Sequence, residues 1–441
     1  MYIILFFFVS SIAFAQTNRI TLEEDSSDLI SSVRKCVASP SRKFIALTHD
    51  EHHCTVFNAY GKSIAKFRYD DDLLDSFEVH YNKNSDRYNT YLRYFSNQLP
   101  YNLPKEYIEK FREKNPSLAE PFILGKNIVV FGNDTILPVP KEDRAKSFKQ
   151  KYTNILFEND SILHIGVMIS IAVADKKRLD NINNLITKNF NGILRYNIYN
   201  QRKTVTWILP TKFDTLFTIV VNQPLWTFCF SDRKKNEYWY NYQLVTYKLY
   251  EDVNIINEIP VFCKINQSGE LVETKKTKLH DYKSKYYSEN GESYLCVAGE
   301  NEYVVHPYID SIFMFTDNNA IRSFPLVNVR RVAEVQKALI PPKNRNSIIS
   351  EKGGYITMTN VLPSKNSGNI IVLMFEVINR DTYQYVAQEY NSHGQLISSY
   401  RLENNPQKRE TLVGYDPHSH SAISTVATDE EGWVMSFYPL Q

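Results

Sequence analysis

The amino-acid sequence predicts an all-β protein, a ring of six four-stranded antiparallel sheets with a few inserted surface helices. Three observations support this prediction. A twelve-residue unit at Phe57–Arg68 returns at Tyr390–Arg401, and both copies read aromatic-Asn-x-x-Gly-polar-x-Ile-x-x-aromatic-Arg. Related turn signals recur along the chain at a spacing of roughly 70 residues, as in repeat architectures. The composition, with 30 Tyr and 25 Phe against 14 Gly, suits strands that pack on neighbouring sheets.

Each copy of the twelve-residue unit is expected to form a β-hairpin. An Asn that opens a type I turn, followed three residues later by a Gly in the left-handed conformation, is typical of a hairpin with a bulged turn. The same Asn-x-x-Gly turn occurs at Asn266–Gly269, and Ile312–Phe324 keeps the flanking apolar residues around a shorter turn. Weaker hairpin patterns lie at Asn127–Leu137 and Ile193–Ile208. These hairpins define six units.

The first unit shows what one sheet would contain. Its four short strands are expected at Leu29–Ala38, Lys43–Thr48, Cys54–Phe57 and Ser63–Arg68, separated by turn signals. One such sheet cannot bury both of its faces alone, and radial stacking of similar sheets is the usual solution. The sequence therefore predicts a six-bladed β-propeller of four-stranded antiparallel blades.

The segment Ser32–Phe67 carries a family resemblance. Its strand, its Ser-Pro turn, the stretch Lys-Phe-Ile-Ala-Leu-Thr-His-Asp and the hairpin resemble the NHL-like six-bladed propellers of secreted bacterial proteins. The resemblance covers the first and last units and implies the propeller fold. Several such proteins carry Gly-Pro-Gly-Glu soon after the hairpin, whereas this chain has Asp70–Asp75 there, so the resemblance does not extend to a shared ligand.

Three inserted segments have the apolar spacing of surface helices. They are Pro104–Lys114, Lys177–Phe190 and Val327–Leu339. We expect them to cover blade edges or to surround one mouth of the channel. No low-complexity linker divides the chain, which favours one domain over two.

The N-terminus predicts export from the cytoplasm. Residues 1–15 form a short apolar run closed by Ala13-x-Ala15, which is the pattern of a signal peptide cleaved before Gln16. No cysteine stands at the cleavage point, which argues against a lipoprotein. No later apolar run is long enough for a spanning helix. We therefore expect residues 16–441 to form a single β-propeller domain that is secreted or periplasmic.

Charge and cysteine content narrow the possible partners. Lys and Arg number 51 against 49 Asp and Glu, in an interspersed pattern that indicates neither nucleic acid nor an anionic membrane as a partner. The five cysteines have no spacing typical of a zinc site or a disulfide framework, which favours buried, unpaired thiols. Cys36 and Cys54 are the one pair on strands expected to be near enough for a bridge.

Two histidine clusters are candidate metal ligands. His49 and His52 lie in a turn between two strands, and His418 and His420 have a spacing that places both imidazoles on one side of an extended segment. The two clusters would approach each other if the C-terminal segment completed the first blade. The alternative for each cluster is an ordinary polar turn.

Three aromatic residues are candidate ligand-binding residues. Trp226, Tyr238 and Trp239 lie in an aromatic-rich stretch that could present flat rings to a sugar or a peptide. The alternative is packing between blades, because the segment that follows alternates as a strand does. Which alternative holds depends on whether the rings are exposed.

No motif in the sequence identifies a reaction. The chain lacks a Gly-x-Ser-x-Gly elbow, a His-Glu-x-x-His helix and a Gly-rich phosphate loop, and its carboxylate runs at Asp70–Asp72 and Asp429–Glu431 are expected to be solvated turns. The favoured function is a non-catalytic binding module for a carbohydrate or protein partner at one mouth of the channel. The alternative is a metal-assisted hydrolase or lyase that acts on a carbohydrate, with the channel-mouth histidines and acidic residues.

Overall fold

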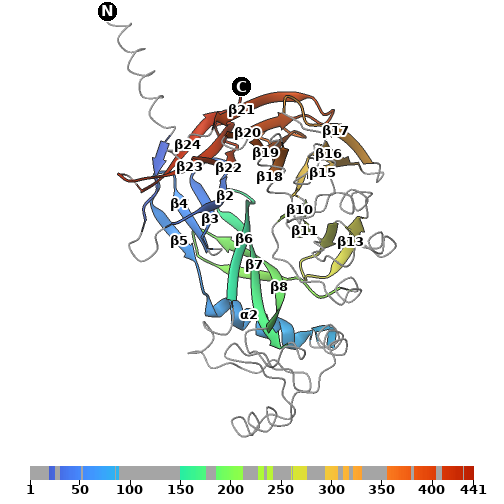
Figure 1. Cartoon of the computed structure of the whole chain (residues 1–441). Helices are drawn as coiled ribbons and strands as arrows, with labels where there is room; N and C mark the ends of the chain where they lie inside the picture. The colour runs from blue at the N-terminus through green and yellow to red at the C-terminus, as the bar shows by residue number, and fades with distance from the viewer. Residues whose placement is uncertain are drawn as a thin grey trace, which may run out of the picture. The chain divides into compact units, whose positions relative to one another are not determined.

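The chain divides into two compact units. The first contains Met1–Lys66, Ile155–Leu163 and Lys285–Gln441, and the second contains Phe67–Asn154 and His164–Ser284. The computed structural model describes residues 19–24, 30–50, 53–84, 86–88, 149–174, 185–211, 227–232, 236–241, 260, 262–275, 294–305, 311–316, 321–329, 355–378, 382–403, 410–430 and 432–441. Figure 1 labels the elements that these residues form.

The described residues form four separate sheets of four strands, and the strands of each sheet are neighbours in sequence order. The first sheet contains β6 (Lys149–Phe157), β7 (Ile162–Ala174), β8 (Leu185–Asn197) and β9 (Lys203–Trp207). The second contains β10 (Phe228–Asp232), β11 (Glu237–Asn241), β12 (Phe262–Ile265) and β13 (Leu271–Lys275). The third sheet contains β14 (Tyr294–Ala298), β15 (Asn301–Val305), β16 (Ser311–Phe315) and β17 (Ile321–Pro325). The fourth contains β18 (Tyr355–Pro363), β19 (Ile370–Val377), β20 (Tyr383–Tyr390) and β21 (Leu396–Glu403).

A fifth sheet has eight strands and brings the two ends of the chain together. Its order is β1-β24-β23-β22-β2-β3-β4-β5. The two halves are joined by parallel pairing of Cys36 with Gly414 and of Val37 with Tyr415. The pairs β1–β24, β24–β23, β23–β22, β2–β3 and β3–β4 are antiparallel. The strands are β1 (Arg19–Thr21), β2 (Val33–Ala38), β3 (Phe44–His49), β4 (His53–Asn58), β5 (Ser63–Phe67), β22 (Thr411–Asp416), β23 (Ser421–Thr428) and β24 (Gly432–Pro439).

This topology confirms an all-β, propeller-like arrangement of small antiparallel sheets. One detail differs from the prediction. The described residues give four separate four-stranded sheets and one eight-stranded sheet rather than six separate ones. The C-terminal strands join the first sheet through the pairing of β22 with β2, and β1, from the N-terminus, pairs with β24 and adds a fourth strand to the C-terminal half.

The predicted hairpin turns are confirmed at three positions. In each, the Gly N–H donates to the carbonyl of the Asn three residues earlier, from Gly61 to Asn58, from Gly269 to Asn266 and from Gly394 to Asn391, at 3.0 Å each. The three glycines have φ values of +81°, +81° and +77°, in the left-handed region that the turn requires. The predicted hairpins at Ile193–Ile208 and Ile312–Phe324 are confirmed as β8–β9 and β16–β17.

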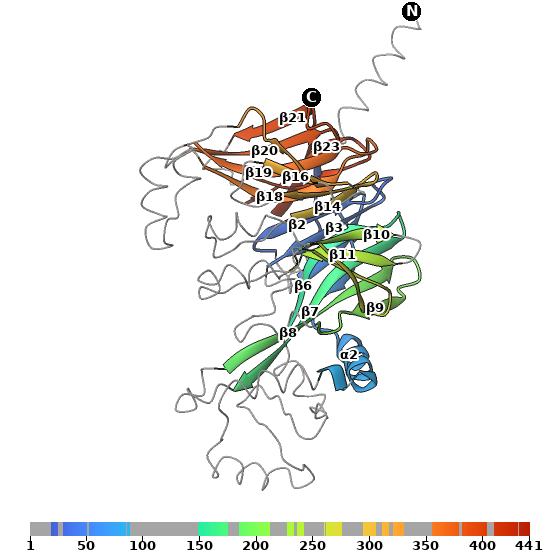
Figure 2. The same ribbon diagram turned by 90° about the vertical axis from the view of Figure 1, so that its right-hand side faces the viewer.

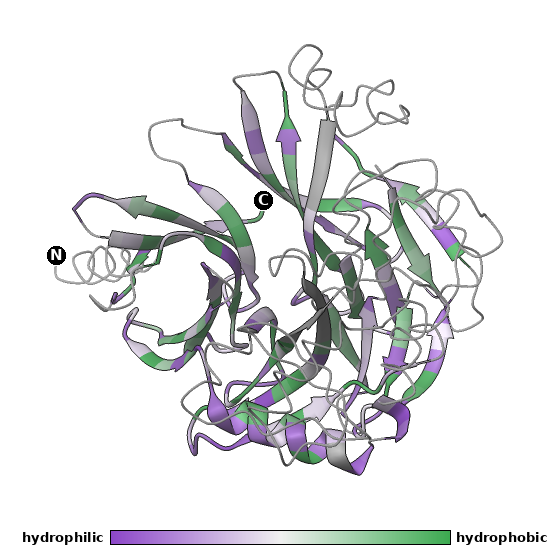
Figure 3. Cartoon of the chain, turned by 60° about the horizontal axis from the view of Figure 1, so that its bottom comes forward, coloured by the Kyte–Doolittle hydropathy of each residue, from purple (hydrophilic) through white to green (hydrophobic). Residues whose placement is uncertain are grey.

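Within the first unit, each face of a sheet is buried against a different neighbour. Ile370, Val372 and Met374 of β19 pack into a cluster with Tyr303 and Ile312 of the β14–β17 sheet. The alternate residues of β19, Ile371 and Leu373, pack instead with residues of β22, β23 and the C-terminus. This alternation is the period of two that a strand imposes on its side chains. Figure 3 shows hydrophobic residues, in green, along the strands.

One helix was missed by the sequence analysis. Helix α2 (Asp71–Lys83) begins where Asp70 caps it, because the Asp70 carboxylate accepts from the Asp72 N–H at 3.0 Å. Asp71 and Asp72 occupy the first turn, where negative charge is favourable. The Asp70–Asp72 run is therefore a helix start, and its interpretation as a solvated turn was wrong.

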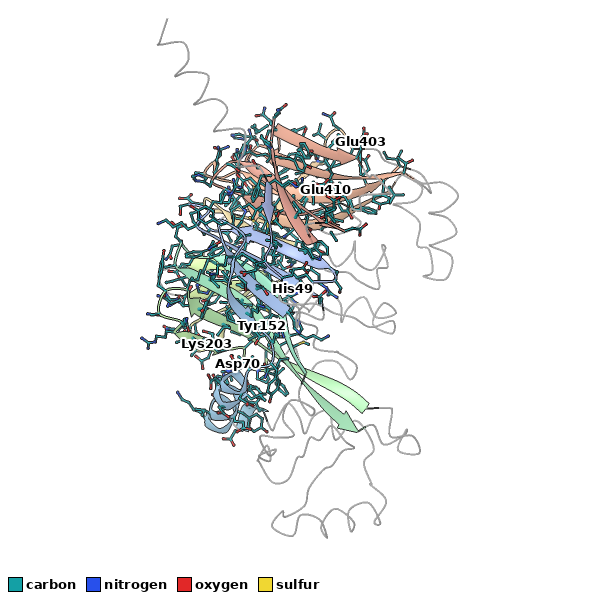
Figure 4. All side chains as sticks on the ribbon, turned by 90° about the vertical axis from the view of Figure 1, so that its left-hand side faces the viewer. His49, Asp70, Tyr152, Lys203, Glu403 and Glu410 are labelled. Atoms are coloured by element: carbon teal, nitrogen blue, oxygen red, sulfur yellow. The ribbon has the colours of Figure 1, made fainter. Side chains whose placement is uncertain are left out.

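Helix α2 packs on β9, as Figure 2 shows. The Phe77 ring lies 5.0 Å from the Trp207 ring, and the Trp207 Nε1–H donates to Ser76 Oγ at 3.2 Å. Asp70 also forms an ion pair with Lys203 of β9, with Nζ 2.6 Å from Oδ2 (Figure 4). The helix therefore covers the outermost strand of its sheet.

Other predictions fall partly or wholly outside the described residues. The helix expected at Lys177–Phe190 is wrong where it can be compared, because β8 begins at Leu185. Residues 327–329 of the expected Val327–Leu339 helix are not helical. The signal peptide of residues 1–15, the hairpin at Asn127–Leu137 and the helix at Pro104–Lys114 lie outside the described residues. No described helix is long and apolar enough to cross a membrane.

The cysteines match the prediction of buried thiols. All five are free and buried, so Cys36 and Cys54 form no bridge. Burial raises the pKa of Cys36, Cys54 and Cys296. A raised pKa disfavours the reactive thiolate.

His80 of α2 should make the stability of the second unit depend on pH. Its Nε2 is buried without a hydrogen-bond partner, and burial, followed by the nearby charge of Lys83, lowers its pKa to about 4. The unfolded chain takes up this proton first, near pH 6.5. The stability that neutral His80 contributes is therefore complete above pH 6.5 and is lost as the pH falls toward 4.

Urea unfolding between pH 7.5 and 4 measures this dependence. His80→Gln should flatten the curve between pH 6.5 and 4, whereas His393→Gln, at an exposed turn, should leave it as in the wild type. Equal slopes for wild type and His80→Gln would show that His80 does not contribute.

Candidate functional site

Five turns from four sheets form a connected polar surface in the first unit, and the eight-stranded sheet contributes two of them. We call it the first-turn surface. Its turns are residues 39–43, 158–161, 298–301, 364–369 and 416–421. Two of its residues, Arg42 and His420, have φ values of 56° and 54°, which is uncommon for residues other than glycine and is frequent at functional sites.

Hydrogen bonds connect several turns of this surface to neighbouring sheets. The Ser41 N–H donates to Asp160 Oδ1 at 2.8 Å, joining the β2–β3 turn to the β6–β7 turn. The Lys365 N–H donates to the Tyr415 hydroxyl at 3.2 Å. The Tyr303 hydroxyl donates to the Gly368 carbonyl at 3.1 Å. The turns are thus held by contacts between sheets as well as by their own strands.

A buried carboxylate, Glu389 at the end of β20, organises the centre of the surface. Its side chain is 1% exposed. Oε1 accepts from Ser364 Oγ, Asn366 Nδ2 and Asn369 Nδ2 at 2.7, 2.8 and 2.9 Å. Oε2 accepts from Ser398 Oγ at 3.0 Å and lies 3.1 Å from His420 Nε2. One carboxylate therefore holds the β18–β19 turn and contacts the β22–β23 turn.

The hydrogen bonds of Glu389 determine its charge. Burial alone would raise its pKa, but the bonds from Ser364, Asn369, Asn366 and Ser398 outweigh burial and lower the pKa to about 2. Glu389 is therefore ionised at neutral pH and can only accept hydrogen bonds.

The ionised Glu389 fixes the proton on His420. Because the carboxylate only accepts, His420 Nε2 must carry a hydrogen and donate it. In the neutral imidazole, Nδ1 is then an acceptor for the Tyr415 hydroxyl, which lies 2.8 Å away. Both ring nitrogens of His420 are thus used inside the network, so the imidazole has no free lone pair for a metal ion.

A second buried carboxylate, Asp416, shapes the β22–β23 turn. It is completely buried and accepts from the His418 N–H at 3.0 Å and from Ser419 Oγ at 2.5 Å. Arg42 of the β2–β3 turn lies 3.7 Å from the Asp416 carboxylate, and its guanidinium lies 3.6 Å from the centre of the Phe437 ring. The bonds to Asp416 leave the His418 side chain exposed at the tip of the turn.

The exposed residues of the first-turn surface are almost all polar. They are Pro40, Lys43, Gly299, Glu300, Lys365, Asn366, Ser367 and His418. No exposed aromatic or large aliphatic side chain is among the described residues of these turns. Such a surface can donate and accept hydrogen bonds but offers no apolar anchor.

The structure places the predicted metal-binding histidines in different environments. His418 and His420 share one turn. His49 is completely buried at the other end of its sheet, opposite Val33, where its Nδ1 lies 2.8 Å from Asp50 Oδ2 and its Nε2 2.9 Å from Thr55 Oγ1. His49 is therefore not brought together with His418 and His420, and His52 lies outside the described residues. Among the described residues, no group of three or more His, Cys, Asp and Glu is placed to hold a metal ion.

The predicted aromatic platform is not exposed. Tyr238 and Trp239 are each only 2% exposed. The Tyr238 hydroxyl lies 3.0 Å from His164 Nδ1, and Lys275 Nζ lies 5.2 Å from the centre of the Trp239 ring. Both residues follow the alternative of packing within the fold, and Trp226 lies outside the described residues.

The central residues of the site were not found from sequence. Glu389, Tyr415 and Arg42 belong to no motif, and their partners come from separate segments of the chain. One signal was present, since Ser39-Pro40 and Asp416-Pro417 both place a capping side chain before a proline in a first turn. That similarity could have directed attention to the first turns.

Comparisons with known proteins give structural neighbours only. No family model matches the sequence, and no curated protein matches it. A DUF4221 family member from Bacteroides vulgatus ATCC 8482 is similar at 9% identity and a TM-score of 0.47, over 96% of each chain. Raptor from Chaetomium thermophilum is similar at 9% identity and a TM-score of 0.39, over 97% of this chain and 28% of Raptor.

A third neighbour is virginiamycin B lyase from Staphylococcus aureus. It is similar at 10% identity and a TM-score of 0.29, over 73% of this chain and 85% of the lyase. None of the three TM-scores reaches 0.5. The fold is therefore described from the sheets of this chain itself.

Proposed function

We propose that the chain is a six-bladed β-propeller in which the two halves of the eight-stranded sheet are separate blades. Each half has four strands, and only two residue pairs join them. The last blade then consists of β22, β23 and β24, with β1 as its outermost strand. In such a ring the N-terminal strand closes the circle of blades, which protects an otherwise open edge.

A repeated contact supports this count. Gly61, Gly269 and Gly394, in the outer turns of three blades, are packed against Thr21, Trp207 and Phe324. These three residues lie on β1, β9 and β17. If β1 is the outermost strand of the last blade, every turn glycine contacts the outermost strand of the blade before it. The same relation then holds at ring closure as inside the ring.

A contact between innermost strands also fits six blades. In a six-bladed ring the first and fourth blades face each other across the axis. Lys35 of β2, the innermost strand of the first blade, has its Nζ 5.5 Å from the ring centre of Tyr294. Tyr294 begins β14, the innermost strand of the fourth blade. Two long side chains can meet in this way across a narrow channel.

We infer that this propeller is exported and acts as a non-catalytic binding module whose ligand, a carbohydrate, binds the first-turn surface. The observation that carries this function is the buried network around Glu389 and Asp416, which fixes two polar turns with their tips exposed. Fixed hydrogen-bonding groups on a rigid scaffold suit recognition. Hydroxyl-rich ligands match a surface of amides, hydroxyls and charges, whereas a protein partner usually needs apolar or aromatic anchors.

Affinity gel electrophoresis tests this function. The chain is run through gels that contain hydroxyethylcellulose, laminarin, polygalacturonate or glycol chitin, and at least one polymer should retard it. The triple variant Lys43→Ala, Lys365→Ala and His418→Ala should lose that retardation. A double variant at the exposed Asp429 and Glu430, in a turn at the other end of β23, should keep it. Equal retardation of both variants would contradict the proposed site.

The same polymers test the alternative hydrolase or lyase. Prolonged incubation with the chain should produce no new reducing ends and no unsaturated products. Either product, if lost in His420→Ala, would favour the enzyme over the binding module.

A further inference from the structure

The outer hairpins of four sheets present one side chain in the same way. In each turn, the side-chain Oδ1 of an Asn accepts from the backbone N–H two residues later. The donors are Tyr60, Tyr199, Ser268 and His393, and the distances are 2.9, 3.0, 3.0 and 2.9 Å. We call this position the turn tip. An Asn that bonds its own backbone in this way holds the turn in one conformation.

In three of these turns the same Asn makes a second hydrogen bond. We call the turn backbone held by these Asn bonds the frame. The same Asn oxygen also accepts from the N–H four residues later, at Lys62, Glu270 and Gln395, each at 3.0 Å. One side-chain oxygen in each of Asn58, Asn266 and Asn391 therefore accepts hydrogen bonds from two backbone N–H groups of its turn. The β8–β9 turn is one residue longer, and Asn197 bonds instead to the Asn200 N–H at 3.3 Å.

The frame is constant but the tip residue is not. Two tips are Tyr, one is Ser and one is His, and all four are exposed. Tyr60 is 89% exposed and Tyr199 is 65% exposed. Single exposed apolar residues are common on any protein. An exposed aromatic ring that recurs at one position of a rigid repeated frame is less easily explained by chance, and variable residues on a constant scaffold are typical of recognition.

We propose that Tyr60 and Tyr199 are additional carbohydrate-binding residues, each stacking its ring on one sugar unit of a polysaccharide. This proposal rests on the proposed function for the class of ligand but not for its site. A pyranose presents a flat face of C–H groups edged by hydroxyls, and a tyrosine ring with polar neighbours matches that face. Lys62, two residues after Tyr60, and Asn200, directly after Tyr199, are polar residues of the same turns.

A polysaccharide fits two exposed rings on separate turns better than a protein does. A stable protein interface buries a continuous patch with packed anchors. Each of these exposed rings lies on a polar turn, and the two turns belong to different sheets. A polymer of identical sugars can bind each ring separately, and binding several such sites on one chain increases the overall affinity.

Affinity electrophoresis tests the proposal, with gels that contain the polysaccharide that retards the wild-type chain most strongly. Tyr60→Ala and Tyr199→Ala should each weaken binding roughly two- to tenfold, which is the range expected for one aromatic contact. Tyr60→Phe should bind as the wild type, because it keeps the ring. Ser268→Ala, at the equivalent tip of another sheet, should also bind as the wild type. Urea unfolding of each variant checks that the fold is unchanged.

The outcomes separate this proposal from the proposed function. If the two alanine variants bind as the wild type while the first-turn triple variant does not, the turn-tip proposal is wrong and the proposed function stands. If the alanine variants lose affinity while the triple variant keeps it, the tips bind and the first-turn surface does not. If no polysaccharide retards the wild-type chain, both are wrong.

Discussion

Gly61→Ala is expected to lower the free energy of unfolding by about 2–5 kcal/mol, combining a left-handed backbone with an overpacked contact. Gly61 has φ +81°, and a Cβ added there would lie 1.9 Å from the Thr21 carbonyl oxygen. That oxygen belongs to β1, the strand that completes the C-terminal half of the eight-stranded sheet. The substitution therefore strains the turn and pushes β1 away from it. Urea unfolding measures the loss.

Gly368→Ala is the matched control for this substitution. Gly368 also has φ +81°, but an added Cβ would meet nothing within 4 Å. Its loss should therefore be the backbone cost alone, about 1–2 kcal/mol. The difference between the two variants measures the contact with β1. Equal losses would mean that β1 does not lie against the turn of Gly61.

Glu389→Ala is expected to cost about 3–5 kcal/mol, because it removes a buried carboxylate that accepts hydrogen bonds from several side chains. The affected donors are Ser364, Asn366, Asn369, Ser398 and His420. Glu403→Ala is the control, since Glu403 is an exposed carboxylate on the next strand of the same sheet (Figure 4). That control should stay within about 0.5 kcal/mol of the wild type, as surface substitutions usually do.

The pH dependence of stability gives a second measure of Glu389. Its folded pKa of about 2 is lower than the ordinary value of 4.5, so the unfolded chain takes up the proton first. The stability it contributes is complete above pH 4.5 and is lost as the pH falls toward 2. Glu389→Gln should remove this part of the acid sensitivity. An unchanged acid limb in Glu389→Gln would contradict the role given to the carboxylate.

Features set by a few neighbouring residues were predicted correctly from sequence. The hairpin at Asn58–Gly61 follows from two residues whose side-chain and backbone preferences act within one turn. The four strands of the first sequence repeat, β2 to β5, were also predicted correctly to within a few residues, because alternation and turn residues mark their ends. The same local chemistry predicted Asn391–Gly394, far along the chain.

The errors came from patterns that two structures share. The spacing of Leu185 and Ile186 after Ile182 matches a helix face, yet Leu185 begins a long strand. The run from Asp70 to Asp72 could be a solvated turn or a capped helix start. The packing of Phe77 against Trp207 favours the helix, and that contact joins residues distant in the sequence.

The candidate site depends on contacts that no spacing encodes. Glu389 stands between Gln388 and Tyr390 in an ordinary strand, and its partners come from three other segments. His420 was predicted to be a site residue because of its spacing from His418. The structure places it beside Glu389, where it donates a hydrogen bond rather than offering a free lone pair.

The most direct test of the proposed ring is a disulfide between its two ends. Arg19 of β1 faces Ser436 of β24, and partners in an antiparallel pair lie close enough for a disulfide. Arg19→Cys with Ser436→Cys should form a bond on oxidation, seen by mass spectrometry, and raise the free energy of unfolding by about 3–5 kcal/mol because it closes a very long loop. Arg19→Cys with Tyr438→Cys, two residues out of register, should bond poorly. A pair at 19 and 436 that stays reduced, or that bonds without stabilising the fold, would contradict closure of the ring by the N-terminal strand.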